Sequence, residues 1–190
     1  VYDQLANNYD VSLFPIPENV YAESVGLVKG RVIVEDGNDK GCDIKLYAKK
    51  AKTSVTYSSN VYDGEFVLSL VEKERYLMKI EKEGYEFCAS FVDVNDTVES
   101  LNFSISQLVG GESYYLPNIV FDESNTLTEE SLEILNEFIL YLKSSRFRIE
   151  IFAPGNQAET IAEYIIKSGV RKDRIAVSKQ SSEKVGYRLQ

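Results

Sequence analysis

The pattern of apolar residues changes near Gly110-Gly111, and this change constrains the fold more than any other feature of the sequence. Before this pair, apolar and polar residues alternate in short stretches separated by turn sequences, as in β-strands. After it, strand-like stretches are followed by apolar residues spaced three and four apart, as in helices. The sequence therefore predicts two domains, an all-β sandwich over residues 26–105 and an α+β domain over residues 113–190, with a linker over residues 106–112.

Residues 1–25 are predicted to form a connector. Residues 9–14 have strand-like composition, but Pro15 and Pro17 end that stretch because proline lacks the N–H that a sheet ladder needs. We expect the 9–14 strand either to join an edge of the sandwich or to belong to a part of the protein upstream of Val1.

Composition limits the classes of function that suit this chain. It has 190 residues, 44% of them hydrophobic, with a formal net charge of −9 and a pI of about 4.7. An acidic protein repels nucleic acid and anionic lipid, so we expect neither as a partner. No apolar run is long enough to span a membrane as a helix, and we expect no cofactor.

Histidine is absent from the sequence, which removes the commonest general base and the commonest metal ligand. Two pairs of acids, Asp122-Glu123 and Glu129-Glu130, resemble acid–base catalysts only in their spacing. We interpret them as solvated groups or as groups that complement a helix dipole. The sequence therefore predicts neither an enzyme nor a metal site.

The two cysteines, Cys42 and Cys88, both fall in or beside predicted strands of the sandwich. Two cysteines are too few for a disulfide framework or a zinc site, so we interpret them as separate free thiols. A single bond between them in an oxidising compartment is the alternative. That bond requires adjacent strands, because the two Cα atoms must come within about 7 Å.

Turn sequences divide residues 26–105 into short segments. Turns are predicted at residues 36–39 and at Asp63-Gly64, where glycine accepts the positive φ of a tight hairpin. The alternating strands are predicted over residues 27–35, 44–46, 66–70, 76–80, 87–94 and 101–105. Short strands with regular turn signals indicate a sandwich.

Three motifs give residues 26–105 a resemblance to a known family. The motifs are Val28-Lys29-Gly30-Arg31-Val32, Asp63-Gly64-Glu65-Phe66, and Tyr76 followed by Glu83-Gly84-Tyr85. With them, the segment resembles the carboxypeptidase regulatory-like, or prealbumin-like, β-sandwich family. The resemblance implies a non-catalytic spacer or docking domain.

Residues 113–190 predict the order strand, helix, strand, helix, strand, strand. Thr128 is a suitable N-cap for the first helix, and Gly169 is a suitable stop after the second. The strands are predicted over residues 116–121, 149–151, 174–178 and 184–189. This order favours an α+β layer of helices on one sheet.

The strand–helix turn, residues 153–156, joins the second strand of this domain to its second helix. It reads Ala-Pro-Gly-Asn, which predicts a tight turn. Unpaired N–H groups at the N-terminus of a helix favour anions. No charged side chain lies between Glu150 and Glu159, however, so any ligand site here lacks an ionic contact of its own.

Residues 113–190 resemble the OmpA-like C-terminal domain family, which binds peptidoglycan. The residues that carry the resemblance are Leu116-Pro117-Asn118-Ile119-Val120-Phe121-Asp122, Leu127-Thr128-Glu129-Glu130-Ser131, Ile149-Glu150-Ile151, Ala158 through Tyr164-Ile165, Lys167-Ser168-Gly169-Val170 and Arg174-Ile175. The resemblance implies a βαβαββ fold and a site for diaminopimelate of the peptidoglycan stem peptide.

The sequence departs from this family at the ligand site. In the family, the second strand ends in a Gly-His-Thr-Asp motif, and a long loop and a helix with an Arg follow; the Asp and the Arg hold diaminopimelate. Here the last motif position is Asn156, the arginine position falls on Gln157, and the loop is deleted. Exchanging two charge-assisted hydrogen bonds for neutral ones weakens binding. The degenerate site is predicted to comprise Phe121, Asp122, Asn156, Gln157 and Arg188.

The two resemblances together imply an envelope protein of the Bacteroidetes type, in which a β-propeller, a regulatory-like sandwich and an OmpA-like domain follow in that order. We expect a periplasmic location, associated with the outer membrane, and other envelope proteins as partners. The expected role is a structural or protein-docking unit of a larger assembly such as secretion or gliding machinery. The alternative is a peptidoglycan anchor that uses Asp122, Asn156 and Arg188 as altered ligands.

Overall fold

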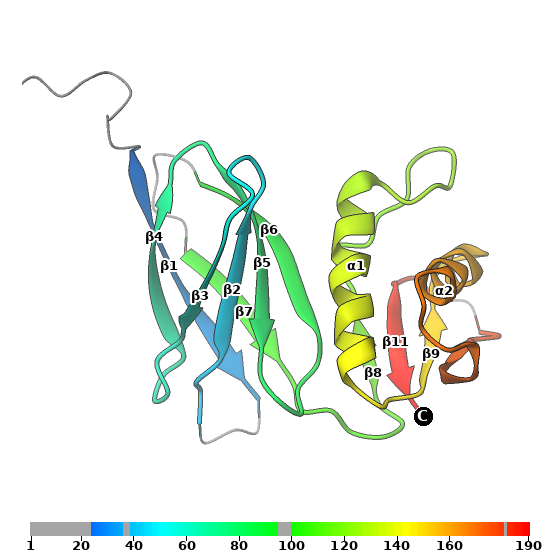
Figure 1. Ribbon diagram of the computed structural model, residues 1–190. Helices are drawn as coiled ribbons and strands as arrows, with labels where there is room; N and C mark the ends of the chain where they lie inside the picture. Colours follow the sequence, from blue (N-terminus) through cyan, green and yellow to red (C-terminus); the bar gives the residue numbers. More distant parts are fainter. Residues whose placement is uncertain (1–23, 36–38, 95–99, 181) are drawn as a thin grey trace, which may run out of the picture.

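The computed structural model has a β-rich fold, in which the described residues form three sheets and two α-helices (Figure 1). The residues that the structure describes are 24–35, 39–94, 100–180 and 182–190. The strand predicted over residues 9–14 and most of the turn predicted over residues 36–39 lie outside these ranges. None of the helices in the described part of the chain is long and apolar enough to cross a membrane.

Two sheets face each other in the first half of the molecule, one with the strand order β4-β1-β7 and the other with the order β3-β2-β5-β6. Their strands are β1 (Val25–Val34), β2 (Asp43–Ala48), β3 (Ser54–Ser58), β4 (Glu65–Val71), β5 (Arg75–Glu81), β6 (Cys88–Asp93) and β7 (Ser100–Ile105). Val28, Val32 and Val34 of β1 are buried between the sheets, whereas Lys29 and Arg31 are exposed. The alternation predicted for a sandwich strand is therefore confirmed in β1.

The turn at Asp63-Gly64 does not form the predicted hairpin. β3 and β4 are edge strands of different sheets, so the turn carries the chain from one sheet to the other. Gly64 does have a positive φ, 76°, and its carbonyl oxygen accepts a hydrogen bond from the Val32 N–H at 2.9 Å. Glycine is needed at this position because the turn passes close to β1, where a Cβ would collide with the Val32 carbonyl.

The third sheet has the strand order β10-β9-β11-β8. The elements of this half are β8 (Ser113–Tyr115), α1 (Glu129–Ser144), β9 (Ile149–Phe152), α2 (Gln157–Lys167), the short 3-10 helix η2 (Lys172–Arg174), β10 (Ile175–Val177) and β11 (Gly186–Leu189). β9 pairs parallel with β10 and antiparallel with β11. The strands and α-helices follow in the predicted order strand, helix, strand, helix, strand, strand.

The strand predicted over residues 116–121 is wrong, because β8 ends at Tyr115. Leu116 and Ile119 are both buried, and the Ile119 N–H donates to the Leu116 carbonyl at 3.3 Å. A turn therefore buries both side chains, and Pro117 within it has no N–H for a sheet ladder. The apolar run follows the spacing of a turn rather than that of a strand.

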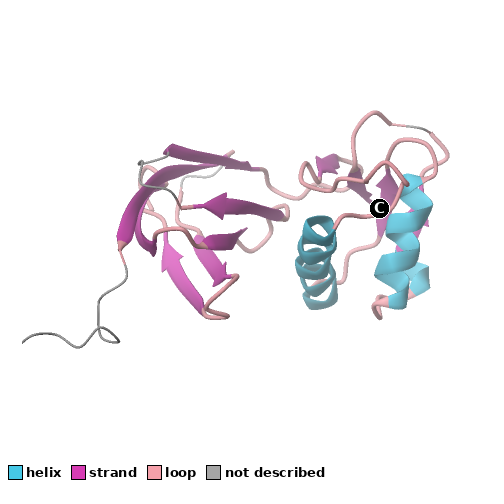
Figure 2. Ribbon diagram, turned by 90° about the horizontal axis from the view of Figure 1, so that it is seen from above, coloured by secondary structure: helices cyan, strands magenta, loops and turns pink. Residues whose placement is uncertain are grey.

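The two helices begin and end as their sequences predict. Thr128 caps α1 by accepting a hydrogen bond from the Ser131 N–H at 3.2 Å. Gly169, at a φ of 97°, follows the end of α2, and its N–H donates to the Ile166 carbonyl at 3.0 Å. Both helices lie on the same side of the third sheet, with α1 between the sandwich and α2 (Figure 2).

The apolar core of the second half extends into the sandwich. Leu77, Phe87 and Ala89 are buried in the same cluster as α1, α2 and the third sheet. The Phe87 ring lies edge-on to the Phe138 ring of α1, with 5.2 Å between centroids. β5 is consequently buried on both faces, with Met78 in the sandwich core and Leu77 against the second half. The sandwich core is a separate cluster, and the outer face of the sandwich contributes to the core of the second half.

The two cysteines are free and lie on opposite sides of β5. Cys42 directly precedes β2, Cys88 begins β6, and both strands pair with β5 rather than with each other. Two strand spacings, about 9.6 Å, therefore separate their strands, which is too far for a disulfide.

Candidate functional site

The strand–helix turn is built as the sequence predicts. β9 ends at Phe152 and α2 begins at Gln157, and the Gln157 N–H donates to the Pro154 carbonyl at 3.1 Å. Gly155 has a φ of 52°, a left-handed conformation that glycine adopts without strain. Because only residues 153–156 separate the two elements, the N-terminus of α2 lies next to the C-terminal end of β9.

Three side-chain amides form a cluster at the N-terminus of α2. The Asn125 Nδ2 donates to the Asn156 Oδ1 at 2.9 Å, and the Gln157 Nε2 donates to the Asn125 Oδ1 at 3.1 Å. Asn125 comes from the loop before α1, so the cluster joins two segments that are far apart in sequence. We call these three residues the amide cluster. Its members use donors and acceptors on one another, and none carries a charge.

Asp122 organises the loop that presents Asn125. Its Oδ1 accepts hydrogen bonds from the N–H groups of Ser124 and Thr126, each at 2.9 Å. These bonds hold Asn125 at a φ of 59°, a left-handed conformation that asparagine tolerates better than most residues. The Asp122 carboxylate therefore supports the turn of its own loop.

Phe121 lies on the inner side of the same loop. It forms an isolated β-bridge with Leu127 and packs, partly buried, against the core of the second half. Because Phe121 pairs with Leu127, the bridge closes the loop shortly before α1 begins. Phe121 is thus a hydrophobic support of the loop.

Arg188 does not join the other predicted site residues. On β11 its neighbour Tyr187 is fully buried in the core that contains both helices, so alternation directs Arg188 to the opposite face of the sheet. There its Nε donates to the Ser113 Oγ at 3.2 Å and its Nη1 lies 3.4 Å from the Glu150 carboxylate. The structure therefore brings Asn156 and Gln157 to the loop of Asp122 but leaves Arg188 elsewhere.

The sandwich and α1 meet at a second polar region, which we call the joint. Three glutamates of α1, spaced three and four residues apart, lie on one face of the helix and pair with cations of the sandwich. The pairs are Glu130 with Arg75 (2.5 Å), Glu133 with Lys49, and Glu137 with Lys79 (2.6 Å). The same two elements also meet in the buried contact of Phe87 with Phe138.

Lys79 is the most deeply placed cation of the joint, with 15% of its side chain exposed. Its Nζ lies 2.6 Å from the Glu137 carboxylate and 2.9 Å from the Glu81 carboxylate. Burial lowers the pKa of Lys79, but the hydrogen bonds to these two carboxylates outweigh it and raise the pKa. Burial likewise raises the pKa of Glu81, but hydrogen bonds from Lys45 and Lys79 outweigh it and lower the pKa.

Two tyrosine hydroxyls complete the joint. The Tyr141 hydroxyl of α1 donates to the Tyr85 carbonyl at 3.0 Å, and the Tyr187 hydroxyl of β11 accepts from the Phe87 N–H at 3.3 Å. Burial raises the pKa of Tyr141 to about 12 and moves that of Tyr187 further upward. Both hydroxyls therefore stay neutral and fix the sandwich against the second half by hydrogen bonds to its backbone.

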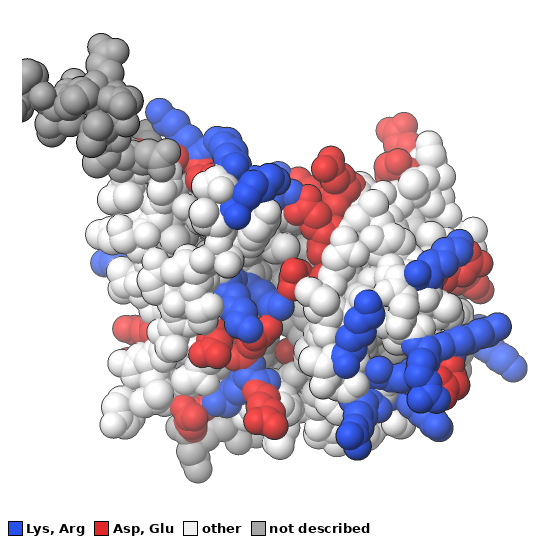
Figure 3. All heavy atoms as spheres, in the orientation of Figure 1, with Lys and Arg blue, Asp and Glu red and all other residues white. Residues whose placement is uncertain are grey.

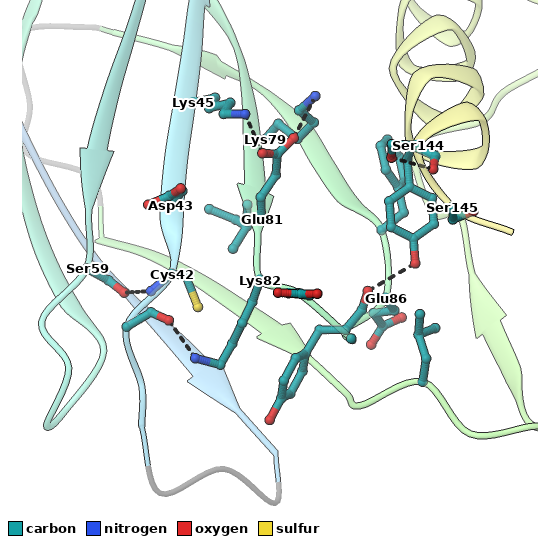
Figure 4. A pocket seen from close by; sticks show the side chains of 18 of the residues that line it. Cys42, Asp43, Lys45, Ser59, Lys79, Glu81, Lys82, Glu86, Ser144 and Ser145 are labelled. Atoms are coloured by element: carbon teal, nitrogen blue, oxygen red, sulfur yellow. Dashed lines mark hydrogen bonds and ion pairs between the residues drawn. The ribbon is translucent and has the colours of Figure 1, made fainter. Parts of the chain in front are cut away.

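A cavity of about 930 Å³ lies beside the joint, between the sheet β3-β2-β5-β6 and the C-terminal end of α1 (Figure 4). Lys82 donates to the Gly41 carbonyl at 2.8 Å, and Glu86 accepts from the Ser106 N–H at 2.9 Å. Burial raises the pKa of Glu86 and of the Cys42 thiol. The Cys42 sulfur is therefore a thiol rather than a nucleophilic thiolate at neutral pH.

Cation-binding chemistry has little support in the described part of the chain, where no three carboxylate or thiol side chains gather as a metal site requires. The chemistry of the amide cluster is limited to neutral hydrogen bonds. Sequence reasoning missed Asn125, which only the fold places beside Asn156 and Gln157. It also missed the joint, because the α1 glutamates resemble ordinary solvated residues in the sequence.

Comparisons with known proteins add little to this geometry. No protein-family model matches the chain, and no curated protein matches it. Thirteen solved chains are similar, and one of them is the 3-chlorocatechol 1,2-dioxygenase of Rhodococcus opacus 1CP, with 13% identity and a TM-score of 0.35. That match covers 50% of this chain and 63% of the dioxygenase, less than two thirds of its length. At this TM-score we infer neither fold nor activity from it.

Proposed function

We propose that this protein is a non-enzymatic module of the bacterial cell envelope, on the periplasmic side of the outer membrane. In this proposal a carboxypeptidase regulatory-like sandwich precedes an OmpA-like domain that has lost its diaminopimelate ligands. The domain acts as a structural or protein-docking unit of a larger assembly, such as secretion or gliding machinery. The motifs of the sequence and the element order β-α-β-α-β-β support this reading.

The amide cluster carries the proposal. A zwitterionic ligand needs opposite charges to offset its loss of hydration, and the positions that would supply them hold Asn156 and Gln157. Both amides already bond Asn125, so a ligand would have to replace existing hydrogen bonds. Neutral hydrogen bonds are about half as strong as charge-assisted ones. Affinity for diaminopimelate is therefore expected to be low.

The peptidoglycan anchor with altered ligands is the competing function. It would need Asp122, Asn156 and Arg188 to converge on one ligand. Arg188 instead faces away from the helices and lies beside Glu150, and the Asp122 carboxylate accepts two N–H groups of its own loop. These contacts favour the docking unit over the anchor.

The joint supports a structural role. Three ion pairs, a shared apolar core and two tyrosine hydroxyls link the sandwich to α1. A connection of this kind holds the two halves in one orientation, which suits a unit that presents surfaces to neighbouring proteins.

Sedimentation with isolated cell-wall sacculi tests the proposal. We expect little of the protein to sediment, and we expect salt to release what does. The variant Asn156→Asp with Gln157→Arg should not restore binding, because adjacent residues cannot reproduce the spacing of the family motif. Tight binding that free diaminopimelate displaces would overturn the proposal and support the anchor.

A further inference from the structure

A basic patch lies at the C-terminal ends of α1 and α2, on a protein whose formal net charge is −9. Figure 3 shows Lys and Arg side chains gathered on this side of the second half, at the lower right. The patch comprises Lys143, Arg146, Arg148, Lys167, Arg171, Lys172 and Arg174. Six of these seven residues are exposed, and Arg174 is partly buried. The positive charge of this surface is opposite to the net charge of the protein, so the clustering of these cations needs an explanation.

Hydrogen bonds hold the segments of the patch together. The Lys143 Nζ at the end of α1 donates to the Ser168 carbonyl after α2 at 2.7 Å. Arg174 donates to the carbonyls of Leu142 and Phe147, each at 2.8 Å, so it joins η2 to the end of α1. The patch is therefore a fixed surface built from three segments of the chain.

Helix dipoles explain only part of this charge. Lys143 and Lys167 lie in the last turns of their helices, where a cation complements the dipole. Arg146, Arg148 and Lys172 lie outside both α-helices, and within the described part of the chain none of them forms an ion pair. Because these three cations form no ion pair with the described residues, their charge is available to attract an external anion.

Arg171 and Asp173 show the geometry that this surface offers to a carboxylate. The Arg171 Nε and Nη2 lie 3.0 and 2.5 Å from the two oxygens of Asp173, a bidentate contact. The hydrogen bonds from Arg171, together with the nearby charges of Arg171 and Arg148, lower the pKa of Asp173. Arg148 thus acts on the same carboxylate from the neighbouring segment. Guanidinium groups suit carboxylates because their planar donors match both oxygens.

We infer that the basic patch binds a short acidic segment, rich in Asp and Glu, of a partner protein. This inference rests on the proposed docking role and names the chemistry of one partner. A membrane surface or a nucleic-acid duplex extends past the patch and meets the repulsion of the remaining acidic molecule. A short segment lies within about one Debye length, 8 to 10 Å, of the patch and is screened from the distant acids. The net charge of −9 therefore favours the short segment.

Fluorescence anisotropy with a labelled Asp/Glu-rich peptide of about eight residues tests the inference on the whole chain. We expect saturable binding at low ionic strength, which is lost near 1 M salt, where the Debye length is about 3 Å. The triple variant Arg146→Glu, Arg148→Glu and Lys172→Glu should weaken binding about tenfold or more, because attractive pairs become repulsive.

The matched control is Lys29→Glu, Lys52→Glu and Lys73→Glu, which changes the net charge by the same amount on the sandwich. It should retain the affinity of the unmodified protein, and circular dichroism should show that both variants remain folded. Equal weakening by both variants, no peptide binding, or stronger binding to anionic vesicles or duplex DNA would each overturn the inference. The sacculus experiment stays independent, since the failure of the proposed function would appear as binding that diaminopimelate displaces and that the patch variant retains.

Discussion

The amide cluster and the joint are both polar contacts between distant segments, but they differ in charge. At the amide cluster, Asn125 joins Asn156 and Gln157 through neutral hydrogen bonds at an exposed surface. At the joint, ion pairs and a buried apolar contact both link α1 to the sandwich. The region predicted as a ligand site therefore holds only neutral hydrogen bonds, whereas the region that links the two halves holds ion pairs. The charged contacts of these two regions thus lie where the two halves meet, which suits a fixed relative orientation of the halves.

The largest expected effect comes from the apolar centre of the joint. Phe87→Ala should lower the free energy of unfolding by about 3–5 kcal/mol, because it leaves a cavity against Phe138 and Tyr141. It should also separate the unfolding of the two halves, measured by hydrogen exchange of the amides of α1 and β1. Phe66→Ala, in the sandwich core, is the control. It should cost a similar amount while the two halves still unfold together. A loss below about 1 kcal/mol for Phe87→Ala would contradict a shared core.

A smaller effect is expected from the ion pairs of the joint. Lys79→Met leaves Glu137 without its partner in a partly buried site, so chemical denaturation should show a loss of about 1–2 kcal/mol. The control Lys167→Met removes an exposed pair with Glu163 and should cost less than about 0.5 kcal/mol. Similar losses in both variants would mean that the joint pairs add no more than surface pairs do.

The unmodified protein and Lys79→Met should also differ in how their stability depends on pH. The pKa of folded Glu81 is lowered, so its contribution to stability is present above the unfolded pKa of about 4.5 and is lost as the pH falls through the folded value. The unmodified protein should therefore lose stability below about pH 4.5. Lys79→Met, which lacks one of the two cations that lower this pKa, should lose less over the same interval.

The smallest effect is expected at the amide cluster. Asn125→Ala removes two exposed hydrogen bonds and places alanine at a φ of 59°, so thermal unfolding should show a loss of about 0.5–1 kcal/mol. Asn125→Gly removes the same side chain but accepts this backbone conformation. It should lose clearly less than the alanine variant. An equal loss in both variants would place the cost in the hydrogen bonds rather than in the backbone.

Local chemistry explains which parts of the fold the sequence predicts. Alternation in β1, the Thr128 cap and the Gly169 stop all depend on neighbours within a few residues, and each is confirmed. The hairpin at Asp63-Gly64 fails because the same turn can join strands of one sheet or of two. Whether two strands pair depends on the packing of both sheets, which no local pattern contains.

The joint was missed for a related reason, although one signal was present. Tyr76-Leu77-Met78 places three apolar residues in succession, which indicates a strand buried on both faces rather than one. The partner of the second face, α1, is more than fifty residues away, so the sequence does not identify it. Likewise, Asn125 and the strand–helix turn become neighbours only when the loop before α1 folds over the third sheet. For Arg188 a signal was present: neighbouring residues of a strand face opposite sides of the sheet, so an inward-facing Tyr187 places Arg188 on the outer face.

The most direct test of the central claim is a quantitative sacculus-binding experiment on the unmodified protein. Sedimentation with purified sacculi would be measured with and without soluble muropeptides that contain diaminopimelate, alongside an OmpA-like protein that retains the family Asp and Arg. We predict that the control protein sediments and is released by the muropeptides. This protein should remain largely in solution, with no change on their addition. Saturable sedimentation of this protein that the muropeptides abolish would contradict the account, and would show that other residues hold the ligand.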